Sequence, residues 1–117
     1  MEAIFDRAGR TVGWLQDDRI LNRDGRHIGF LANESIVDYS GRHLGVLHGG
    51  FVRDHAGHAV AFTPGASGGP LLPLPELPPL APLPSLAPLK PLAPLAPLPG
   101  LPSLSWSNTS WDQLFSR

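Results

Sequence analysis

The chain has 117 residues, a formal net charge of −1 and no cysteine. The small charge argues against a general binder of nucleic acid or acidic membranes, and the lack of cysteine excludes disulfide bonds and thiolate metal sites. The N-terminus lacks the basic region and apolar run of a signal peptide, and no stretch approaches the ~18 uninterrupted apolar residues of a spanning helix. We therefore expect a soluble, cytoplasmic protein without a transmembrane segment.

The first half of the chain repeats itself four times at a strict interval of 16 residues. Each unit holds a β-branched residue, then Asp or Asn, then Gly three residues later, then Arg or His, a second apolar residue and a small one. The four motifs are Asp6-Arg7-Ala8-Gly9-Arg10, Asn22-Arg23-Asp24-Gly25-Arg26, Asp38-Tyr39-Ser40-Gly41-Arg42 and Asp54-His55-Ala56-Gly57-His58. Such a repeat indicates one supersecondary unit used four times.

Each unit is predicted to be a β-hairpin. Asp or Asn starts a turn through its side chain, and Gly takes the left-handed position that closes a three-residue loop. This register pairs Asp6 with Arg10 and Ile4 with Val12, and likewise in the other units. Alternation then puts four further residues on the face of the β-branched set, as the predicted core: Trp14, Phe30, Val46 and Phe62. The small residues after the second apolar position (Gly13, Gly29, Gly45 and Ala61) indicate a crowded axis, a bulge, or floor space for an aromatic ring.

The four motifs resemble those of the four-fold β-flower proteins, over about residues 2–63. The resemblance implies a bacterial protein with four hairpins around a pseudo-four-fold axis, and it brings no assigned activity and no catalytic residues. The fourth unit departs most, with Arg53 at an otherwise apolar position. The predicted fold class is all-β: four hairpin repeats in a closed or nearly closed ring, followed by a Pro/Leu-rich tail that is extended (polyproline II) or disordered.

Residues 64–104 form a glycine-containing hinge and a proline–leucine segment. A leucine falls at every third position from Leu71 to Leu104. Because polyproline II has three residues per turn, these leucines share one edge of an extended rod that could reach on the order of 100 Å. A semi-rigid spacer is one interpretation. The alternatives are that the edge binds a partner, a second copy, or a groove on the β domain of residues 1–63.

Residues 105–117 form a tryptophan-containing terminal peptide. Ser110 and Gln113 predict a capping box for a single helical turn, on which Trp111, Leu114 and Phe115 share one side. Exposed tryptophan presents a large apolar surface, so Trp106 and this turn are predicted to dock on a protein partner or on the β domain.

A second candidate binding set lies in the hairpins. Pseudo-four-fold symmetry would place Arg10, Arg26, Arg42 and His58 on one ring. A ring of guanidinium groups suits phosphate or carboxylate ligands, such as a lipid headgroup or a small anion. Each Arg or His also has Asp or Asn as its cross-strand neighbour, so structural ion pairing is the competing interpretation.

Catalysis and metal binding have little support. The histidines, among them His27 and His43 at one repeat position, are interpreted as surface residues, because a zinc site needs three or four converging ligands. The turn carboxylates have a structural role already, and no recognised catalytic or nucleotide-binding motif occurs. We predict no enzyme activity, no metal and no cofactor.

Two functions remain in view. The first is a non-catalytic interaction or scaffold module that displays a proline–leucine arm and a C-terminal docking peptide. The second is a domain that binds a small ligand, a lipid or an anion in the apolar centre and arginine rim of the hairpin ring.

Overall fold

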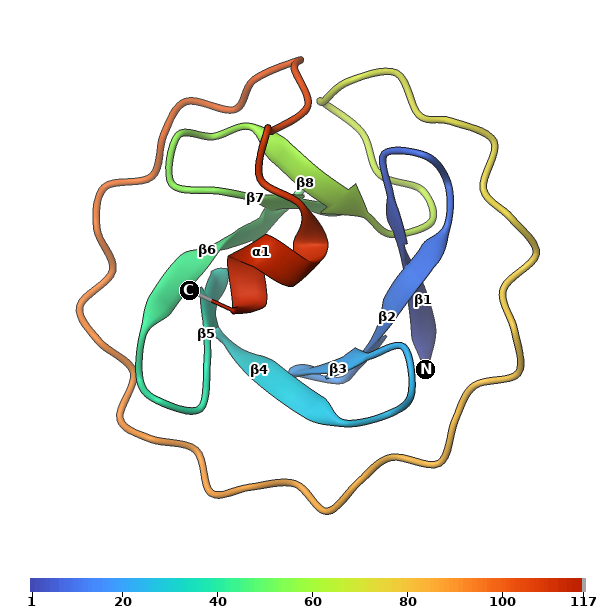
Figure 1. The fold of residues 1–117 in the computed structure, drawn as a ribbon. Coiled ribbons are helices and arrows are strands. Elements are labelled where there is room, and N and C mark those ends of the chain that lie inside the picture. The colour runs from blue at the N-terminus through green and yellow to red at the C-terminus, as the bar shows by residue number, and fades with distance from the viewer. Residues whose placement is uncertain (117) are drawn as a thin grey trace.

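Eight antiparallel strands close into a barrel in the computed structural model, which describes residues 1–116 (Figure 1). Each strand pairs with the next along the chain, and β8 returns to β1 through the pairs Phe5–Phe62 and Asp6–Ala61. The strands are β1 (Glu2–Asp6), β2 (Thr11–Gln16), β3 (Arg19–Asn22), β4 (His27–Ala32), β5 (Ser35–Val37), β6 (His43–His48), β7 (Phe51–Arg53) and β8 (Ala59–Phe62). The prediction of an all-β ring of four hairpins is confirmed, and full closure leaves no unpaired edge strand.

The repeated Asp-x-x-Gly motif forms the turn of each hairpin as predicted. In the first hairpin, the Asp6 side chain accepts hydrogen bonds from the backbone N–H groups of Ala8 (2.9 Å) and Arg10 (3.0 Å). The Asp6 N–H donates to the Arg10 carbonyl at 2.9 Å, which is the predicted pairing. Gly9 has a φ of +82°, and the equivalent glycines of the other hairpins lie between +88° and +94°. Only glycine adopts this left-handed backbone without strain.

The predicted pairing of Ile4 with Val12 is wrong by one residue. Phe5 pairs with Thr11, but Ile4 pairs with Gly13, so Val12 is the extra residue of a β-bulge. The same shift occurs in the other three hairpins, where the bulged residues are Ile28, Leu44 and Val60. A bulge reverses which face the following residues occupy.

The bulge also overturns the predicted core face. The barrel interior holds one β-branched residue from each hairpin (Ile4, Ile20, Ile36 and Val52), together with Leu44, Val60 and two residues of the C-terminal segment, Trp111 and Leu114. Trp14 and Phe62, which were predicted to share this face, instead belong to a second cluster with Phe5 on the outer side. Phe30 packs on Tyr39, and Val46 is only partly buried.

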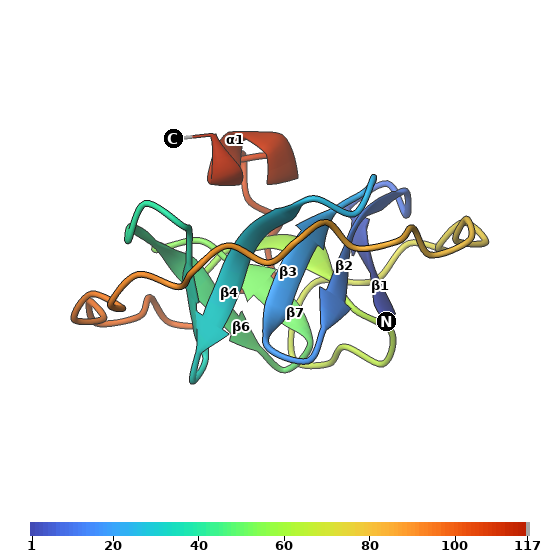
Figure 2. The same ribbon diagram turned by 90° about the horizontal axis from the view of Figure 1, so that it is seen from below.

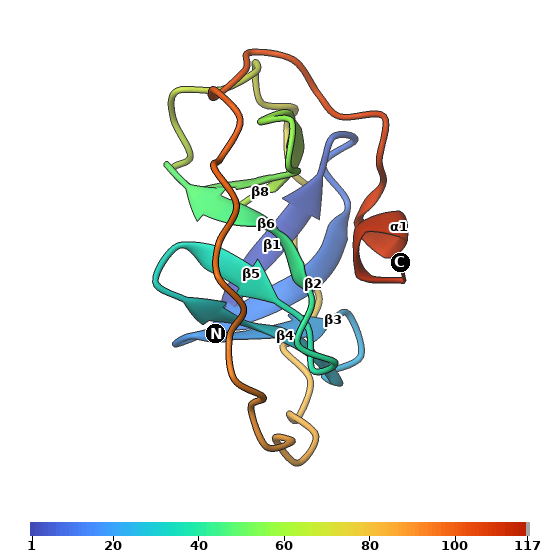
Figure 3. The same ribbon diagram turned by 90° about the vertical axis from the view of Figure 1, so that its left-hand side faces the viewer.

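Residues 70–104, here called the belt, wrap around the barrel and contain no helix or strand (Figures 1 and 2). Of the interpretations that the sequence left open for this segment, contact with the β domain is the one observed: the belt lies against the barrel rather than extending away from it, and the molecule measures only 36 × 36 × 21 Å. Figure 3 shows the last part of the belt crossing the outer side of β5 and β6. The chain then turns inward, and α1 (Trp111–Phe115) covers one end of the barrel. Within residues 1–116, no helix is long and apolar enough to cross a membrane.

Candidate functional site: the belt and the terminal helix

The terminal helix α1 fills one end of the barrel with the three residues that were predicted as a docking face. Trp111 and Leu114 are buried among the interior residues, and Phe115 packs beside them. The predicted capping box forms between Ser110 and Gln113. These side chains therefore contact the chain's own barrel.

Two of the small residues in the repeat make room for α1. A Cβ atom on Gly13 would lie 2.7 Å from the Trp111 ring and 2.6 Å from the Leu21 carbonyl oxygen. A Cβ atom on Gly29 would lie 3.1 Å from the Phe115 ring. The floor space that the sequence indicated is thus used by aromatic rings of the terminal peptide.

Trp106 joins the end of the belt to the barrel. The N–H of Ala59 donates to the Ser105 carbonyl (3.1 Å), and the N–H of Ser107 donates to the Ala59 carbonyl (2.7 Å). This forms an isolated parallel bridge between Ala59 and Trp106. The indole ring packs against Phe51 and Phe62 of the outer cluster, at centroid distances of 6.2 Å. Trp106 is therefore another contact between the terminal peptide and its own barrel.

The four residues of the predicted anion-binding ring stand at equivalent turns, and two of them have carboxylate partners. Arg10 pairs with Asp6 at 3.2 Å and Arg42 with Asp38 at 3.0 Å. Arg26 donates its backbone N–H to the side-chain oxygen of Asn22. His58 likewise donates its backbone N–H to the carboxylate of Asp54. The contacts of these residues match the structural interpretation of the motif more closely than an open anion site.

The belt contacts successive hairpins at positions that are nine residues apart, so it is in register with them. A Cβ atom added to Gly9, Gly25 or Gly57 would lie 2.1–2.6 Å from the carbonyl oxygen of Leu74, Leu83 or Leu101, respectively. Four units of nine residues, at about 3.1 Å per residue, span about 110 Å. A circle 36 Å across has nearly the same circumference. The belt length thus fits one full turn around the barrel.

Backbone hydrogen bonds repeat with the same nine-residue interval. The N–H groups of Glu76, Ser85 and Ser103 donate to the carbonyls of Gly9 (2.7 Å), Gly25 (2.9 Å) and Gly57 (3.1 Å). The equivalent residue at the third hairpin is Pro94. Proline has no N–H, so this bond cannot form there, and the belt lies farther from Gly41, with the Leu92 carbonyl oxygen 4.0 Å from an added Cβ.

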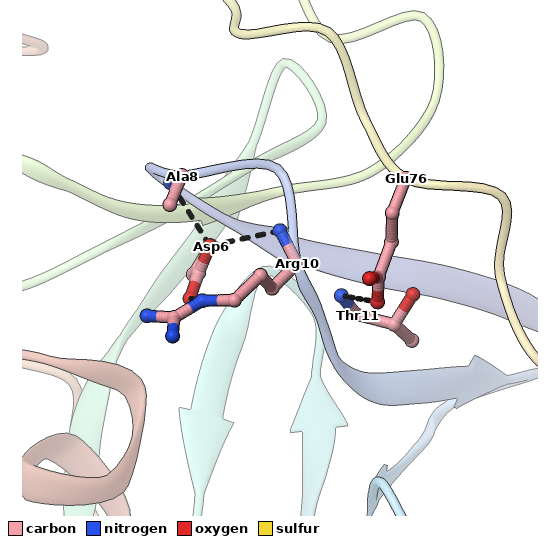
Figure 4. A network of polar contacts seen from close by, with 5 residues as sticks. All are labelled: Asp6, Ala8, Arg10, Thr11 and Glu76. Atoms are coloured by element: carbon pink, nitrogen blue, oxygen red, sulfur yellow. Dashed lines mark hydrogen bonds and ion pairs between the residues drawn. The ribbon is translucent and has the colours of Figure 1, made fainter.

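Two belt residues form a second hydrogen bond with the barrel, through their side chains. Glu76 Oε1 accepts from the N–H of Thr11 at 2.7 Å, beside the Asp6–Arg10 turn (Figure 4). This bond is the main reason that the pKa of Glu76 is lowered. In the second hairpin, Ser85 Oγ accepts from the N–H of His27 at 3.2 Å. Sequence reasoning missed both residues, although each is a polar side chain in a proline-rich segment, nine positions apart.

These paired bonds give a prediction with an internal control. Glu76→Ala is expected to speed amide hydrogen exchange at Thr11 several-fold while leaving His27 unchanged, and Ser85→Ala should do the reverse. Exchange measured by NMR at both amides tests this, because the bonds are local and independent. Equal effects of either variant on both amides would contradict separate attachment points.

Arg53 connects the two ends of the belt. It is 2% exposed, although it carries a full charge. Its Nη1 donates to the carbonyls of Gly57 (2.7 Å) and Ser103 (2.8 Å), and its Nη2 donates to the carbonyl of Gly68 (3.0 Å). The guanidinium group also lies over the Phe51 ring. Arg53, which departs from the repeat pattern, therefore links the segment just before the belt to the last part of the belt.

The leucines of the belt point away from the barrel. All twelve at the three-residue interval are exposed, from 74% at Leu104 to 97% at Leu86 and Leu95. The belt is attached through backbone groups and through Glu76, Ser85 and Lys90, the last of which pairs with Asp18. None of these attachments uses a leucine side chain, so folding does not account for the leucine edge.

A family model described as "4-fold beta flower protein" matches residues 2–115. The chain belongs to the β-flower family. The match covers the belt and α1 as well as the hairpins, so the resemblance extends well beyond the expected residues 2–63. Comparisons with curated proteins and with solved structures found no match.

An apolar cleft of about 840 Å³ lies where the belt of this β-flower protein begins. Its walls come from Ala3, Phe5, Trp14 and Phe62 on the barrel and from residues 72–78 of the belt, with Glu2 and Glu76 also in the lining. The four apolar barrel residues of its lining belong to the outer cluster, so this cleft lies on the outer side of the barrel.

Two of the histidines, His43 and His55, contact each other. His43 Nδ1 lies 2.9 Å from His55 Nε2, with the rings stacked, and His43 Nε2 lies 3.0 Å from Ser35 Oγ. Burial and the neighbouring His55 lower the pKa of His43, and burial lowers that of His27. Within residues 1–116, no group of three or more histidine or acidic side chains could hold a metal ion.

The lowered histidine pKa values predict a pH dependence of stability. Both groups are favoured as neutral in the folded state, so the unfolded state takes up protons first as the pH falls through about 6.5. The free energy of unfolding is therefore expected to fall between about pH 7.5 and pH 5.5. The double variant His27→Gln, His43→Gln should flatten this slope in urea titrations, and an unchanged slope would assign the dependence to other groups.

Proposed function

We propose that the protein is a non-catalytic interaction module whose belt presents its leucine edge to a protein partner. The proposal rests on the near-complete exposure of twelve regularly spaced leucines, on a segment that is fixed to the barrel by hydrogen bonds. Single exposed leucines are common, but a continuous apolar surface marks an interaction site. Each leucine that moves from water into an apolar contact gains about 1.5–3 kcal/mol.

The order of the belt supports this function. A disordered segment loses much of its binding energy to the entropy of ordering. Here Glu76, Ser85, Ser103 and Arg53 fix the opposite edge of the belt before any partner arrives. The leucine edge is thus preorganised. The non-catalytic part of the proposal is supported by the turn carboxylates, since Asp6, Asp38 and Asp54 each accept backbone hydrogen bonds within their own turns.

Hydrophobic-interaction chromatography on octyl resin tests the proposal with a defined apolar surface. The variant with Leu80, Leu83, Leu86 and Leu89 replaced by serine should elute much earlier than the parent. The matched control replaces Ala81, Ala87, Ala93 and Ala96 by serine, which adds the same number of hydroxyl groups on a neighbouring exposed edge, and should elute with the parent. Equal elution of the two variants would refute the leucine edge as the contact surface.

The apolar cleft favours a second candidate function, the binding of a small amphipathic cation. Its walls are apolar and aromatic, as in small-molecule sites, and its two ionisable side chains are the carboxyl groups of Glu2 and Glu76. Dodecyltrimethylammonium is a suitable probe in native mass spectrometry. A one-to-one adduct that is lost on Ala3→Trp, which fills the cleft, would support this function, and no adduct with the parent would reject it.

A further inference from the structure

We propose that the partner of the leucine edge is the same edge of a second copy, so that copies associate side by side in one plane. This inference rests on the proposed function of the belt. The belt encircles the barrel at mid-height (Figures 1 and 2). Its twelve regularly spaced leucines are exposed all along this path. A flat partner would touch a single arc of this ring. Neighbours around the disc would use all of it.

The edge is complementary to itself. Its leucines recur every three residues, or about 9 Å along an extended chain, and proline and alanine lie between them. A leucine of one copy therefore fits between two leucines of the other, above small or rigid neighbours. Two discs with the same end facing up meet with their belts antiparallel, which is a two-fold, isologous contact. The nine-residue repeat offers the same contact on each quarter of the ring.

The charge distribution favours a lateral arrangement. Residues 77–89 and 91–104 contain no charged side chain, so two arcs can meet without like-charge repulsion. The charged residues within the belt are Glu76 and Lys90, and Lys90 is paired with Asp18. One end of the disc carries the Arg10 and Arg42 ion pairs near α1, and the other carries turns with Asp17, Asp18 and Glu34. Charged side chains thus stand on both ends of the disc, whereas two long arcs of its edge carry none.

The size of one contact sets the form of the assembly. Two curved edges touch along one arc, which brings only about a quarter of the leucines, roughly three per copy, into contact. A stable dimer usually buries about 800 Å² and 20–30 residues on each side. A single contact is therefore weak, and association grows through several contacts around each disc. The expected behaviour is reversible, concentration-dependent growth rather than a discrete dimer.

Sedimentation velocity of the full chain, from micromolar to millimolar concentration, is the first test. The parent and the four-alanine control should show a sedimentation coefficient that rises with concentration. A variant with one serine in every quarter (Leu71, Leu80, Leu89 and Leu98) should remain a monomer. The variant with four adjacent serines (Leu80, Leu83, Leu86 and Leu89), which alters two neighbouring quarters, should still associate through the other two quarters. Association that persists unchanged in the one-per-quarter variant would overturn the inference.

The cysteine-free chain allows a direct test of geometry. Leu86→Cys should form disulfide-linked dimers rapidly on mild oxidation, whereas Asp24→Cys, on a hairpin turn, should not. A parent that stays monomeric at every concentration, or equal crosslinking at both positions, overturns the inference. If the monomeric parent still shows leucine-dependent retention on octyl resin, the proposed function stands and only this inference fails. If the parent shows no leucine-dependent retention either, both the inference and the proposed function fail. Leucine-dependent cosedimentation of a monomer with phosphatidylcholine vesicles would assign the edge to lipid instead.

Discussion

Replacing Trp111 with alanine is expected to lower the free energy of unfolding by about 3–5 kcal/mol, the usual cost of removing a buried aromatic ring. Trp111 is 4% exposed and packs with the β-branched residues that line the barrel. Its ring also lies directly against Gly13. In a chain of this size, the melting temperature should fall by more than about 10 °C. Urea and thermal unfolding, followed by far-UV circular dichroism, measure both quantities.

The neighbouring residue provides the control for this prediction. Asp112 lies on the same helix but is exposed, so Asp112→Ala should change the free energy of unfolding by less than about 0.5 kcal/mol. If Trp111→Ala is as mild as this control, α1 is a peripheral attachment, and the barrel interior is stable without it. The expected large difference would instead establish that the terminal helix completes the hydrophobic core.

The hairpins could be predicted from the sequence because their signals are local. Asp6 and Gly9 specify a turn within five residues, and the fourfold repeat specifies the ring. The register failed at Val12, where an extra residue enters the strand among apolar neighbours. No single residue type marks such a bulge in an apolar run. The recurring small residue at Gly13 was the available signal, because glycine in a strand often accompanies a bulge or a close approach.

The belt could be predicted only in part, because its period is local but its attachment is not. The three-residue spacing predicts leucines on one edge of an extended chain, and all twelve are exposed in the structure. It does not say whether the opposite edge meets the barrel. That information lies in two unequal intervals, 16 residues between Gly9 and Gly25 and nine between Glu76 and Ser85. One 16-residue hairpin and one nine-residue stretch of belt cover the same quarter of the ring. This correspondence becomes evident only once the ring of hairpins is known.

Arg53 shows the same limit at a single position. The repeat identified it as a departure from an apolar pattern, but its three acceptors are carbonyl groups, which no side-chain pattern reveals. Two of them, on Gly68 and Ser103, lie 15 and 50 residues away in the chain. A buried charge is retained where its hydrogen bonds offset the loss of hydration. Arg53 meets this condition at Nη1 and Nη2, on which the start and the end of the belt converge, whereas its buried Nε has no hydrogen-bond partner among the described residues.

Arg53→Met is therefore expected to lower the free energy of unfolding by at least about 3 kcal/mol, since hydrogen bonds to a charged group each contribute about 1.5–3 kcal/mol. Methionine keeps the apolar stem but leaves the carbonyls of Gly57, Ser103 and Gly68 without this donor. Arg53→Lys should be intermediate, because an ammonium group cannot reproduce the planar fork of donors.

The location of the defect distinguishes attachment of the belt from general damage. In Arg53→Met, the Ser103 amide should lose protection from hydrogen exchange, while the Ser85 amide, bonded to Gly25 on the hairpin opposite in the ring, should keep most of its protection. Arg10→Met is the matched control, since its exposed ion pair contributes less than about 1 kcal/mol. If Arg53→Met resembles Arg10→Met in both measurements, the belt is closed by its backbone bonds and by Trp106, and the buried charge has another role.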